Sequence, residues 1–165
     1  EQIIQKLQLT KHPEGGHFKE VYRSEEFIMA ESLPERFNGN RNFGTAIYFL
    51  LNENDISAFH RVKQDEIWHH YDGSSLIMHT IDGEGNYLKQ IIGKNIENNE
   101  KPQLVVPNGV WMAAEVEDKR NFALVGCTTA PAFDFKDFEL AEVKQMVNLF
   151  PQHKELIFKF TNTDY

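Results

Sequence analysis

The stretch from residue 57 to residue 73 (SAFHRVKQDEIWHHYDG) constrains the fold of this chain more than any other. Strand-forming residues flank the polar turn 63–65, a pattern that predicts two short strands folding back on each other. Side chains alternate between the two faces of a strand, so two groups should each share a face: His60 with Val62, and Glu66 with Trp68 and His70. If the hairpin closes, an imidazole, a carboxylate and an indole meet on one sheet surface. The stretch therefore predicts the centre of a binding or catalytic site.

Other short apolar runs are separated by turn residues at regular spacing. The predicted strands are His17 to Arg23, Thr45 to Leu51, Leu76 to Ile81, Tyr87 to Ile92, Gln103 to Val106, Val110 to Val116 and Phe122 to Thr128. The polar segment 25–42 predicts a long surface loop. Many short strands with regular turns are typical of an all-β barrel or jelly roll.

The pattern changes to helical periodicity near both ends of the chain. A short amphipathic helix is expected over residues 2–9. After residue 131, an apolar stripe predicts a helix that begins at Asp137 and ends before Pro151, and the segment 154–160 predicts a second helix. We expect one domain over residues 1–165, with a jelly-roll core at about 15–131 and C-terminal helices at about 137–160 packed outside it.

Composition excludes several classes of function. The net charge of −8 and the pI near 5.3 argue against nucleic-acid binding, which needs a basic surface. No apolar run approaches the length of a membrane span, and no signal peptide is evident. A single cysteine, Cys127, allows no internal disulfide and suggests a reducing compartment. We expect a cytoplasmic protein that binds neither nucleic acid nor membrane.

The first long predicted strand carries an unusual face, on which Glu20 lies between Phe18 and Tyr22. An unpaired buried carboxylate is costly, so an acid between two aromatic residues needs an explanation. Either this is an edge strand with Glu20 in water or paired with an arginine, or these side chains line a pocket.

Several segments together resemble a known family. The pattern His60-x-Val62-x3-Glu66-x6-Gly73 resembles the first motif of the cupin superfamily, and Pro107-Asn108-Gly109-x2-Met112 resembles the second. The resemblance extends over nearly the whole chain to the poorly characterised cupin-5-type family, through HPEGGHFKEVYRS, GTAIYFLL, QLVVPNGVWMAA and LVGCTTAPAFDFKDFELA. It implies a double-stranded β-helix jelly roll, commonly assembled as a homodimer.

The departures from the superfamily motifs bear on metal binding. The resemblance implies a metal site of two histidines and a glutamate from the first motif and a histidine from the second, but Val62 and Met112 stand at two of these positions. Only His60 and Glu66 remain unless the barrel brings His70 or His17 close, which nothing in the spacing requires, and metal sites usually have three or four protein ligands. We expect no metal and no other cofactor, and an acid–base pair made by His60 and Glu66 instead.

The remaining candidate site residues are expected to bind the ligand around this pair. They are Phe18, Glu20, Tyr22, Tyr48, Trp68, His70 and Met112, the last filling space at the position of the missing histidine.

Three kinds of function fit these residues. The first is a metal-independent enzyme acting on a small polar metabolite, for example a sugar or nucleotide-sugar isomerase or epimerase, because proton transfer beside a carbonyl needs only a poised base, an acid and a dry pocket. The second is a non-catalytic protein that binds or senses a small ligand. The third is a structural homodimer with a relict pocket. The fold alone does not decide between them.

Overall fold

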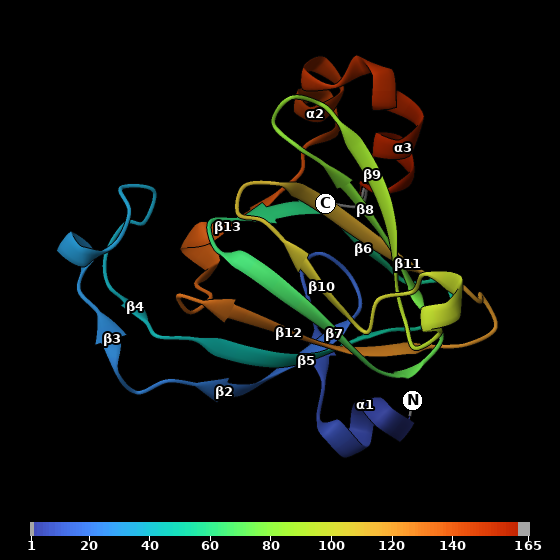
Figure 1. Ribbon diagram of the computed structural model, residues 1–165, viewed down its shortest axis with the longest axis horizontal. Helices are drawn as coiled ribbons and strands as arrows, with labels where there is room; N and C mark the ends of the chain where they lie inside the picture. Colours follow the sequence, from blue (N-terminus) through green and yellow to red (C-terminus); the bar gives the residue numbers. More distant parts are fainter. Residues whose placement is uncertain (1, 162–165) are drawn as a thin grey trace.

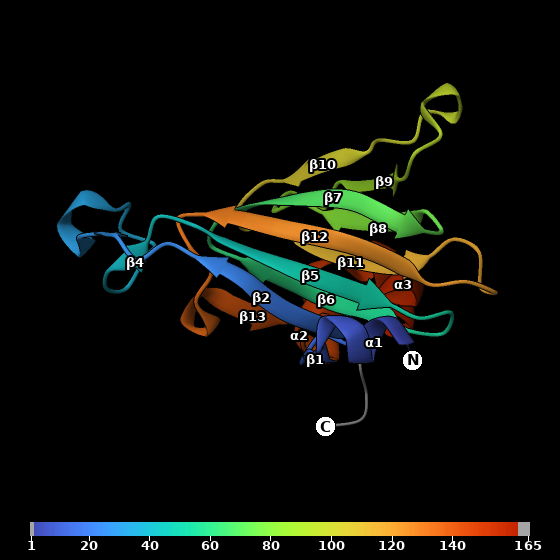
Figure 2. The same ribbon diagram turned by 90° about the horizontal axis from the view of Figure 1, so that it is seen from below.

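The computed structural model describes residues 2–161, which form two antiparallel β-sheets facing each other (Figures 1 and 2). The larger sheet has the strand order β1 (Thr10–Lys11), β2 (His17–Arg23), β5 (Thr45–Leu51), β12 (Ala123–Ala130), β7 (Asp65–Gly73) and β10 (Gln103–Val106). The smaller sheet has the order β13 (Phe138–Leu140), β6 (Ile56–Val62), β11 (Trp111–Val116), β8 (Leu76–Ile81) and β9 (Tyr87–Ile92). This arrangement confirms the predicted all-β class and most of the predicted strands.

The two strands of the 57–73 stretch do not form a hairpin, and this part of the prediction is wrong. Strand β6 pairs with β11 and β13, whereas β7 pairs with β12 and β10, so the two strands lie in opposite sheets. The connection crosses between the sheets at Gln64, whose side chain is fully buried and donates to the carbonyl oxygen of Ala132 and to Asp137. His60 and Glu66 therefore face each other across the interior instead of standing side by side on one sheet.

Two separate cores explain why many strands are apolar on both faces. The space between the sheets is filled by residues such as Phe49, Trp68 and Met112. The outer face of the smaller sheet, including Phe59 and Trp111, is covered by the C-terminal helices α2 (Val143–Leu149) and α3 (Lys154–Lys159) (Figure 1). The helices thus pack outside the sheets, as predicted.

The helical segments differ in their bounds from the prediction. The N-terminal helix α1 spans Gln2–Leu7, and the short 3₁₀ helices are η1 (Ala30–Ser32), η2 (Ile96–Asn98), η3 (Phe135–Asp137) and η4 (Pro151–His153). The helix expected from Asp137 begins only at Val143, because Phe138–Leu140 pairs with β6 as strand β13. Leu140, the first residue of the predicted apolar stripe, therefore lies in a strand, and its helical spacing from the later residues of the stripe is coincidental. Within residues 2–161, no helix is long and apolar enough to cross a membrane.

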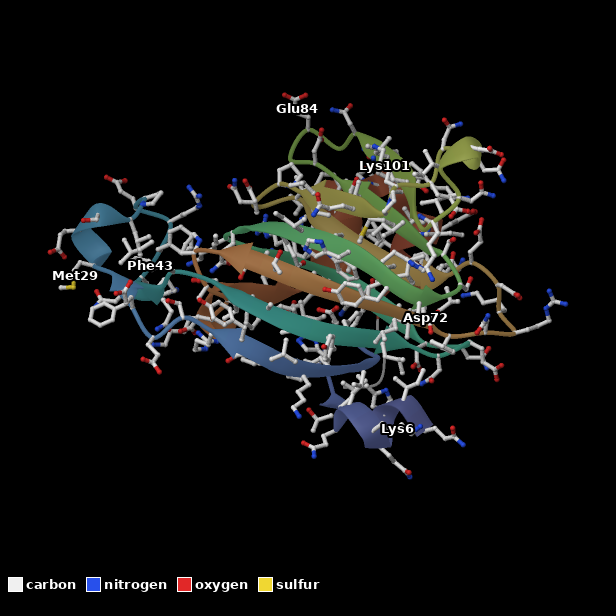
Figure 3. The ribbon with its side chains drawn as sticks, turned by 60° about the horizontal axis from the view of Figure 1, so that its bottom comes forward. Lys6, Met29, Phe43, Asp72, Glu84 and Lys101 are labelled. Atoms are coloured by element: carbon white, nitrogen blue, oxygen red, sulfur yellow. The ribbon has the colours of Figure 1, made fainter. Side chains whose placement is uncertain are left out.

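The segment 25–42, predicted as a loop, contains a small hairpin of β3 (Phe27–Ile28) and β4 (Arg41–Asn42). It projects from one end of the larger sheet, where Met29 and Phe43 are about half exposed (Figures 2 and 3). Its base is nevertheless anchored, because Arg41 is buried and makes a bidentate ion pair with Asp137.

Candidate functional site

A cavity of about 330 Å³ lies between the two sheets. Strands of both sheets line it, together with the loop before β2 and the segment 133–138. The residues are His12, Glu14, Phe18, Glu20, Arg23, Thr45, Ile47, Phe49, His60, Val62, Glu66, Trp68, Cys127, Thr129, Phe133, Asp134, Phe135 and Phe138. Ring systems and carboxyl groups dominate this surface.

Five of the candidate site residues named from the sequence line this cavity: Phe18, Glu20, His60, Glu66 and Trp68. The alternation of side chains placed them on the correct strand faces, and the curvature of the two sheets brings those faces together. Whether they bind a ligand or catalyse a reaction stays a prediction.

Tyr22 does not line the cavity, contrary to expectation, because a β-bulge reverses the alternation. Glu20 pairs with Ile47 of β5, but Tyr22 pairs with the adjacent Ala46, so one residue of β2 is unmatched between them. Tyr22 therefore turns to the outer face of the sheet, where 57% of its surface is exposed.

Tyr48, His70 and Met112 also lie outside the cavity lining. Tyr48 alternates with two inward residues of β5, Ile47 and Phe49, so it points outward and makes an edge-to-face contact with Tyr71. His70 lies beyond Trp68 on β7, and its Nε2 is 2.9 Å from the carbonyl oxygen of Ser74. Met112 is packed within the inner core.

The main cavity residues that the sequence analysis missed are His12 and Glu14. They lie in the loop before β2, where strand alternation makes no prediction. Two glycines with positive φ, Gly15 (+112°) and Gly16 (+66°), turn the chain so that the Glu14 side chain enters the interior, where it is 5% exposed. A signal is present in the segment HPEGG, since an acid before two glycines suggests a backbone shaped to aim it.

Glu14 connects the two histidines of the cavity. Its Oε2 lies 3.2 Å from Nε2 of His60 and 3.3 Å from Nδ1 of His12, and its Oε1 accepts a 2.8 Å hydrogen bond from the hydroxyl of Ser57. The backbone N–H of Glu14 also donates to Nδ1 of His12 at 3.3 Å. The loop and strand β6 are thus joined through one carboxyl group.

The contacts of His60 and Glu14 limit where their protons can lie. Nδ1 of His60 is 2.7 Å from the carbonyl oxygen of Ala58, which can only accept, so Nδ1 carries a proton. With a proton shared between Nε2 of His60 and Oε2 of Glu14, no two lone pairs face each other at 3.2 Å; Nδ1 of His12, 3.3 Å from the same oxygen, competes for that proton. The pair is therefore either a neutral imidazole with a carboxylic acid or an imidazolium with a carboxylate.

Burial favours the neutral form of this pair. It raises the pKa of Glu14, an effect that His12 and the Ser57 hydrogen bond only partly oppose. Burial also lowers the pKa of His60, against the attraction of Glu66. Both shifts favour the neutral imidazole with the protonated carboxyl group, a form in which Nε2 of His60 is a base.

Glu66 is a second titratable group facing the same space. Burial raises its pKa to about 7, although His60 and a hydrogen bond from Trp68 oppose the rise. The Trp68 Nε1–H donates to its Oε2 at 3.1 Å. A carboxyl group with this pKa can give or take a proton near neutral pH. Burial raises the pKa of Cys127 well above its ordinary value, so this thiol stays neutral.

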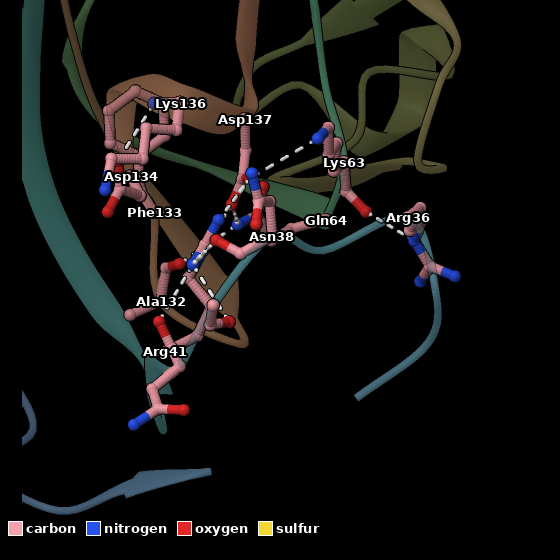
Figure 4. Close-up of polar contacts among 12 residues, drawn as sticks. Arg36, Asn38, Arg41, Lys63, Gln64, Ala132, Phe133, Asp134, Lys136 and Asp137 are labelled. Atoms are coloured by element: carbon pink, nitrogen blue, oxygen red, sulfur yellow. Dashed lines mark hydrogen bonds and ion pairs between the residues drawn. The ribbon is translucent and has the colours of Figure 1, made fainter. Parts of the chain in front are cut away.

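The aromatic residues of the segment 133–138 line the cavity, and a buried polar cluster holds this segment in place (Figure 4). The rings of Phe133 and Phe135 are in edge-to-face contact at 5.0 Å, and Phe138 stacks on His60 at 5.4 Å. Asp137, within this segment, accepts hydrogen bonds from Arg41 and Gln64 at 2.7 Å. The β3–β4 hairpin and the β6–β7 connection thereby fix the position of the aromatic segment.

The sequence analysis offered two interpretations of Glu20: an acid in water or paired with an arginine, or a residue that lines a pocket. It lines the cavity, and it also forms a bidentate ion pair with Arg23, with distances of 2.9 Å and 2.7 Å. The same guanidinium donates to the carbonyl oxygen of Phe133 at 3.1 Å, so it links β2 to the aromatic segment.

Two facing antiparallel sheets around an interior site, with helices outside, define a cupin-superfamily protein with a jelly-roll fold. The comparison with known families is consistent with this class: residues 1–141 match the Cupin_5 family, described as cupin superfamily (DUF985). The chain belongs to that family.

Relatives and solved structures extend this result. The chain is 34% identical over 148 residues to the uncharacterized protein YML079W of Saccharomyces cerevisiae, and the match covers 83% of this chain and 72% of the yeast protein. It is similar to protein SO0799 from Shewanella oneidensis, with a TM-score of 0.87 and 34% identity, covering 98% and 96% of the two chains. A hypothetical protein from Leishmania major gives a TM-score of 0.86 and 31% identity, with 96% of each chain covered.

More distant structures share the fold alone. Oxalate decarboxylase from Bacillus subtilis gives a TM-score of 0.56 at 14% identity, covering 91% of this chain and 36% of the other. This similarity supports the jelly-roll fold and carries nothing about the reaction.

The residues present do not fit the metal site of the wider superfamily. Val62 offers no donor atom, and Met112 offers a buried thioether, which suits hard divalent ions poorly. Nε2 of His60, the nitrogen not bonded to Ala58, already faces Glu14. Within the described part of the chain, no group of three or more His, Cys, Asp or Glu side chains is arranged to hold a metal ion.

Proposed function

We propose that this protein is a metal-independent enzyme that binds a small polar metabolite in the cavity and transfers a proton to and from it. The observation that carries the proposal is the pair of His60 and Glu14, whose Nε2 and Oε2 lie 3.2 Å apart in a cavity lined by aromatic rings. Glu66, with a pKa raised to about 7, supplies a second proton donor or acceptor in the same space.

The reaction class that suits these groups is an isomerisation or epimerisation beside a carbonyl group. A base takes the proton from the carbon next to the carbonyl, and an acid returns a proton to the oxygen or to the other face of the carbon. No atoms are gained or lost overall, so no cofactor is required. His60 and Glu66 are the catalytic residues in this proposal, and Glu14 is the proton partner of His60.

A ligand without phosphate groups suits the cavity better than a nucleotide-sugar. A diphosphate needs cationic partners, but Arg23 is the only arginine or lysine among the lining residues within 2–161, and it is engaged by Glu20. The aromatic walls offer stacking surfaces for a ring.

Solvent deuterium exchange tests the proposal even while the substrate is unidentified. The purified protein is incubated in D₂O with a fraction of small metabolites that carry no phosphate group, and mass spectrometry follows compounds that gain one deuteron at carbon. We expect at least one such compound, with the gain lost in His60→Ala and in Glu66→Gln.

His69→Ala is the matched control, because His69 points to the outer face and contacts Thr128. It should retain the exchange. If wild-type protein retains a compound by native mass spectrometry but catalyses no exchange, the protein is a binding or sensing cupin; equal exchange in His60→Ala would reject the catalytic assignment.

A further inference from the structure

The cavity has more acidic groups than groups with a permanent positive charge. Four carboxylic acids line it, and its one permanently charged cation is committed elsewhere. The acids are Glu14, Glu20, Glu66 and Asp134. Arg23 donates to both oxygens of Glu20 and to the carbonyl oxygen of Phe133. The two lining histidines have pKa values lowered by burial, so they offer no firm positive charge. An anionic ligand would therefore be buried without a counter-charge, which is costly.

The walls of the cavity are suited to a positive charge instead. Six aromatic residues surround it: Phe18, Phe49, Trp68, Phe133, Phe135 and Phe138. They come from the larger sheet, the smaller sheet and the segment between β12 and β13, so rings face the interior from several sides. The face of an aromatic ring attracts a cation, an effect worth about 0.5–2 kcal/mol per well-placed ring and largest for tryptophan.

One oxygen of Glu66 lacks a protein partner. Glu66 is 8% exposed and lines the cavity, and within residues 2–161 its side chain receives one hydrogen bond, from Trp68 to Oε2. Oε1 is left as an acceptor with no protein donor. Oε1 is not fully buried, so a donor on a ligand in the cavity can reach it.

We propose that the ligand of this cavity is an organic cation, a protonated amine on a small apolar or aromatic body, which donates an N–H to Oε1 of Glu66 and lies against the surrounding rings. This inference rests on the proposed function of the cavity as a small-molecule site and names its ligand class. In such a complex Glu66 is ionised beside the ammonium group, which is also the charge state that a proton acceptor needs. The ammonium favours the ionised carboxylate, so binding below about pH 7 releases a proton from Glu66.

Three probes of equal size and different charge test the ligand class. They are phenethylamine, phenethyl alcohol and phenylacetate, titrated into the purified protein by calorimetry near pH 6.5. We expect the amine to bind at least about tenfold more tightly than the alcohol, a difference of ~1.4 kcal/mol. Phenylacetate should bind most weakly. Repeating the titration in buffers of different ionisation enthalpy should show proton release for the amine alone.

Glu66→Gln should remove the preference for the amine over the alcohol and abolish the proton release. Glu139→Gln is the control, because Glu139 is a half-exposed acid paired with Arg61 outside the cavity, and it should change neither quantity. Thermal unfolding of each variant verifies that it is folded.

Equal affinity for amine and alcohol, tightest binding of phenylacetate, or no binding of the amine would each overturn the cation assignment. These results leave the proposed proton transfer to be judged by the deuterium exchange, which does not depend on these probes. Loss of exchange with intact amine binding would reject the enzyme and keep the ligand class.

Discussion

His60 shows how hydrogen bonds determine the chemistry of a buried residue. The carbonyl of Ala58 fixes the proton on Nδ1, and this directs the basic nitrogen to Glu14. Because the imidazole is held in one tautomer, its basic nitrogen lies at a defined position, where it can accept a proton. Burial raises the pKa of the neighbouring Glu14 carboxyl group, which favours its protonated form beside the ring.

The pKa of Glu66 predicts how the stability of the protein depends on pH. Its pKa is about 7 in the folded protein against an ordinary value of 4.5, so the folded state retains a proton that the unfolded chain loses. The protonated Glu66 therefore contributes fully to the free energy of unfolding below pH 4.5, and this contribution is lost as the pH rises through about 7. The loss is on the order of 3 kcal/mol.

The amide side chain in Glu66→Gln has no titrating proton, so the pH dependence of stability that comes from Glu66 should disappear in this variant. Urea unfolding of both proteins between about pH 4.5 and pH 8 measures it: the wild type should lose stability relative to the variant as the pH rises. Parallel curves would show that Glu66 has an ordinary pKa.

At the residue scale, strand alternation is sufficient to place some site residues and fails for others. It places Phe18, Trp68 and the pair His60 and Glu66 on inward faces, because period-two geometry holds along an undisturbed strand. It fails at Tyr22, because a bulge intervenes and no local residue type announces it. It says nothing of Glu14, which lies in a loop.

At the scale of elements, the β6–β7 connection is the least predictable feature. The turn residues 63–65 are equally compatible with a hairpin and with two strands in opposite sheets. The second arrangement buries Gln64 against Asp137, a residue far along the chain. Contacts between distant segments decide such a choice, so a local pattern cannot. The strand β13 departs from the predicted helix for a similar reason, since its pairing with β6 outweighs the local period.

The glycine turn before β2 predicts a destabilised variant. A Cβ at Gly15 would lie 2.1 Å from the carbonyl oxygen of Ile56, and the φ of +112° is unfavourable for other residues. Gly15→Ala should therefore cost about 2 kcal/mol or more in the free energy of unfolding and displace Glu14 from the cavity.

Gly83→Ala is the control for this prediction. Nothing lies within 4 Å of its added Cβ, so its stability should change by less than about 1 kcal/mol. Chemical denaturation of both variants makes the comparison, and a Gly15→Ala protein as stable as Gly83→Ala would refute the role of the turn.

At the scale of the whole molecule, the two sheets differ in what covers their outer faces. The C-terminal helices cover the smaller sheet, whereas the larger sheet exposes an apolar row of directly paired residues. The row is Tyr22, Ala46, Thr128, Ile67 and Val105. Tyr22 and Val105 are 57% and 51% exposed. We propose that a second copy of the chain packs on this face, as the family resemblance implied.

Light scattering at micromolar concentration tests this homodimer. The mass should be twice the 19.2 kDa of one chain, and Val105→Asp should return it to that of a monomer. Leu88→Asp is the matched control, because Leu88 is 53% exposed on β9 of the other sheet and should leave the dimer intact. A wild-type monomer, or dissociation by Leu88→Asp alone, would contradict the proposed interface.

The position of the shared proton in the cavity is the most direct test of the proposed chemistry. Nitrogen-15 NMR of the histidine rings near pH 7, with the signal of His60 assigned by its loss in His60→Gln, reports the protonation of each ring nitrogen. The expected result is a neutral ring with the proton on Nδ1 and a bare Nε2 facing Glu14. A doubly protonated ring, or a proton on Nε2 with a bare Nδ1, would contradict it.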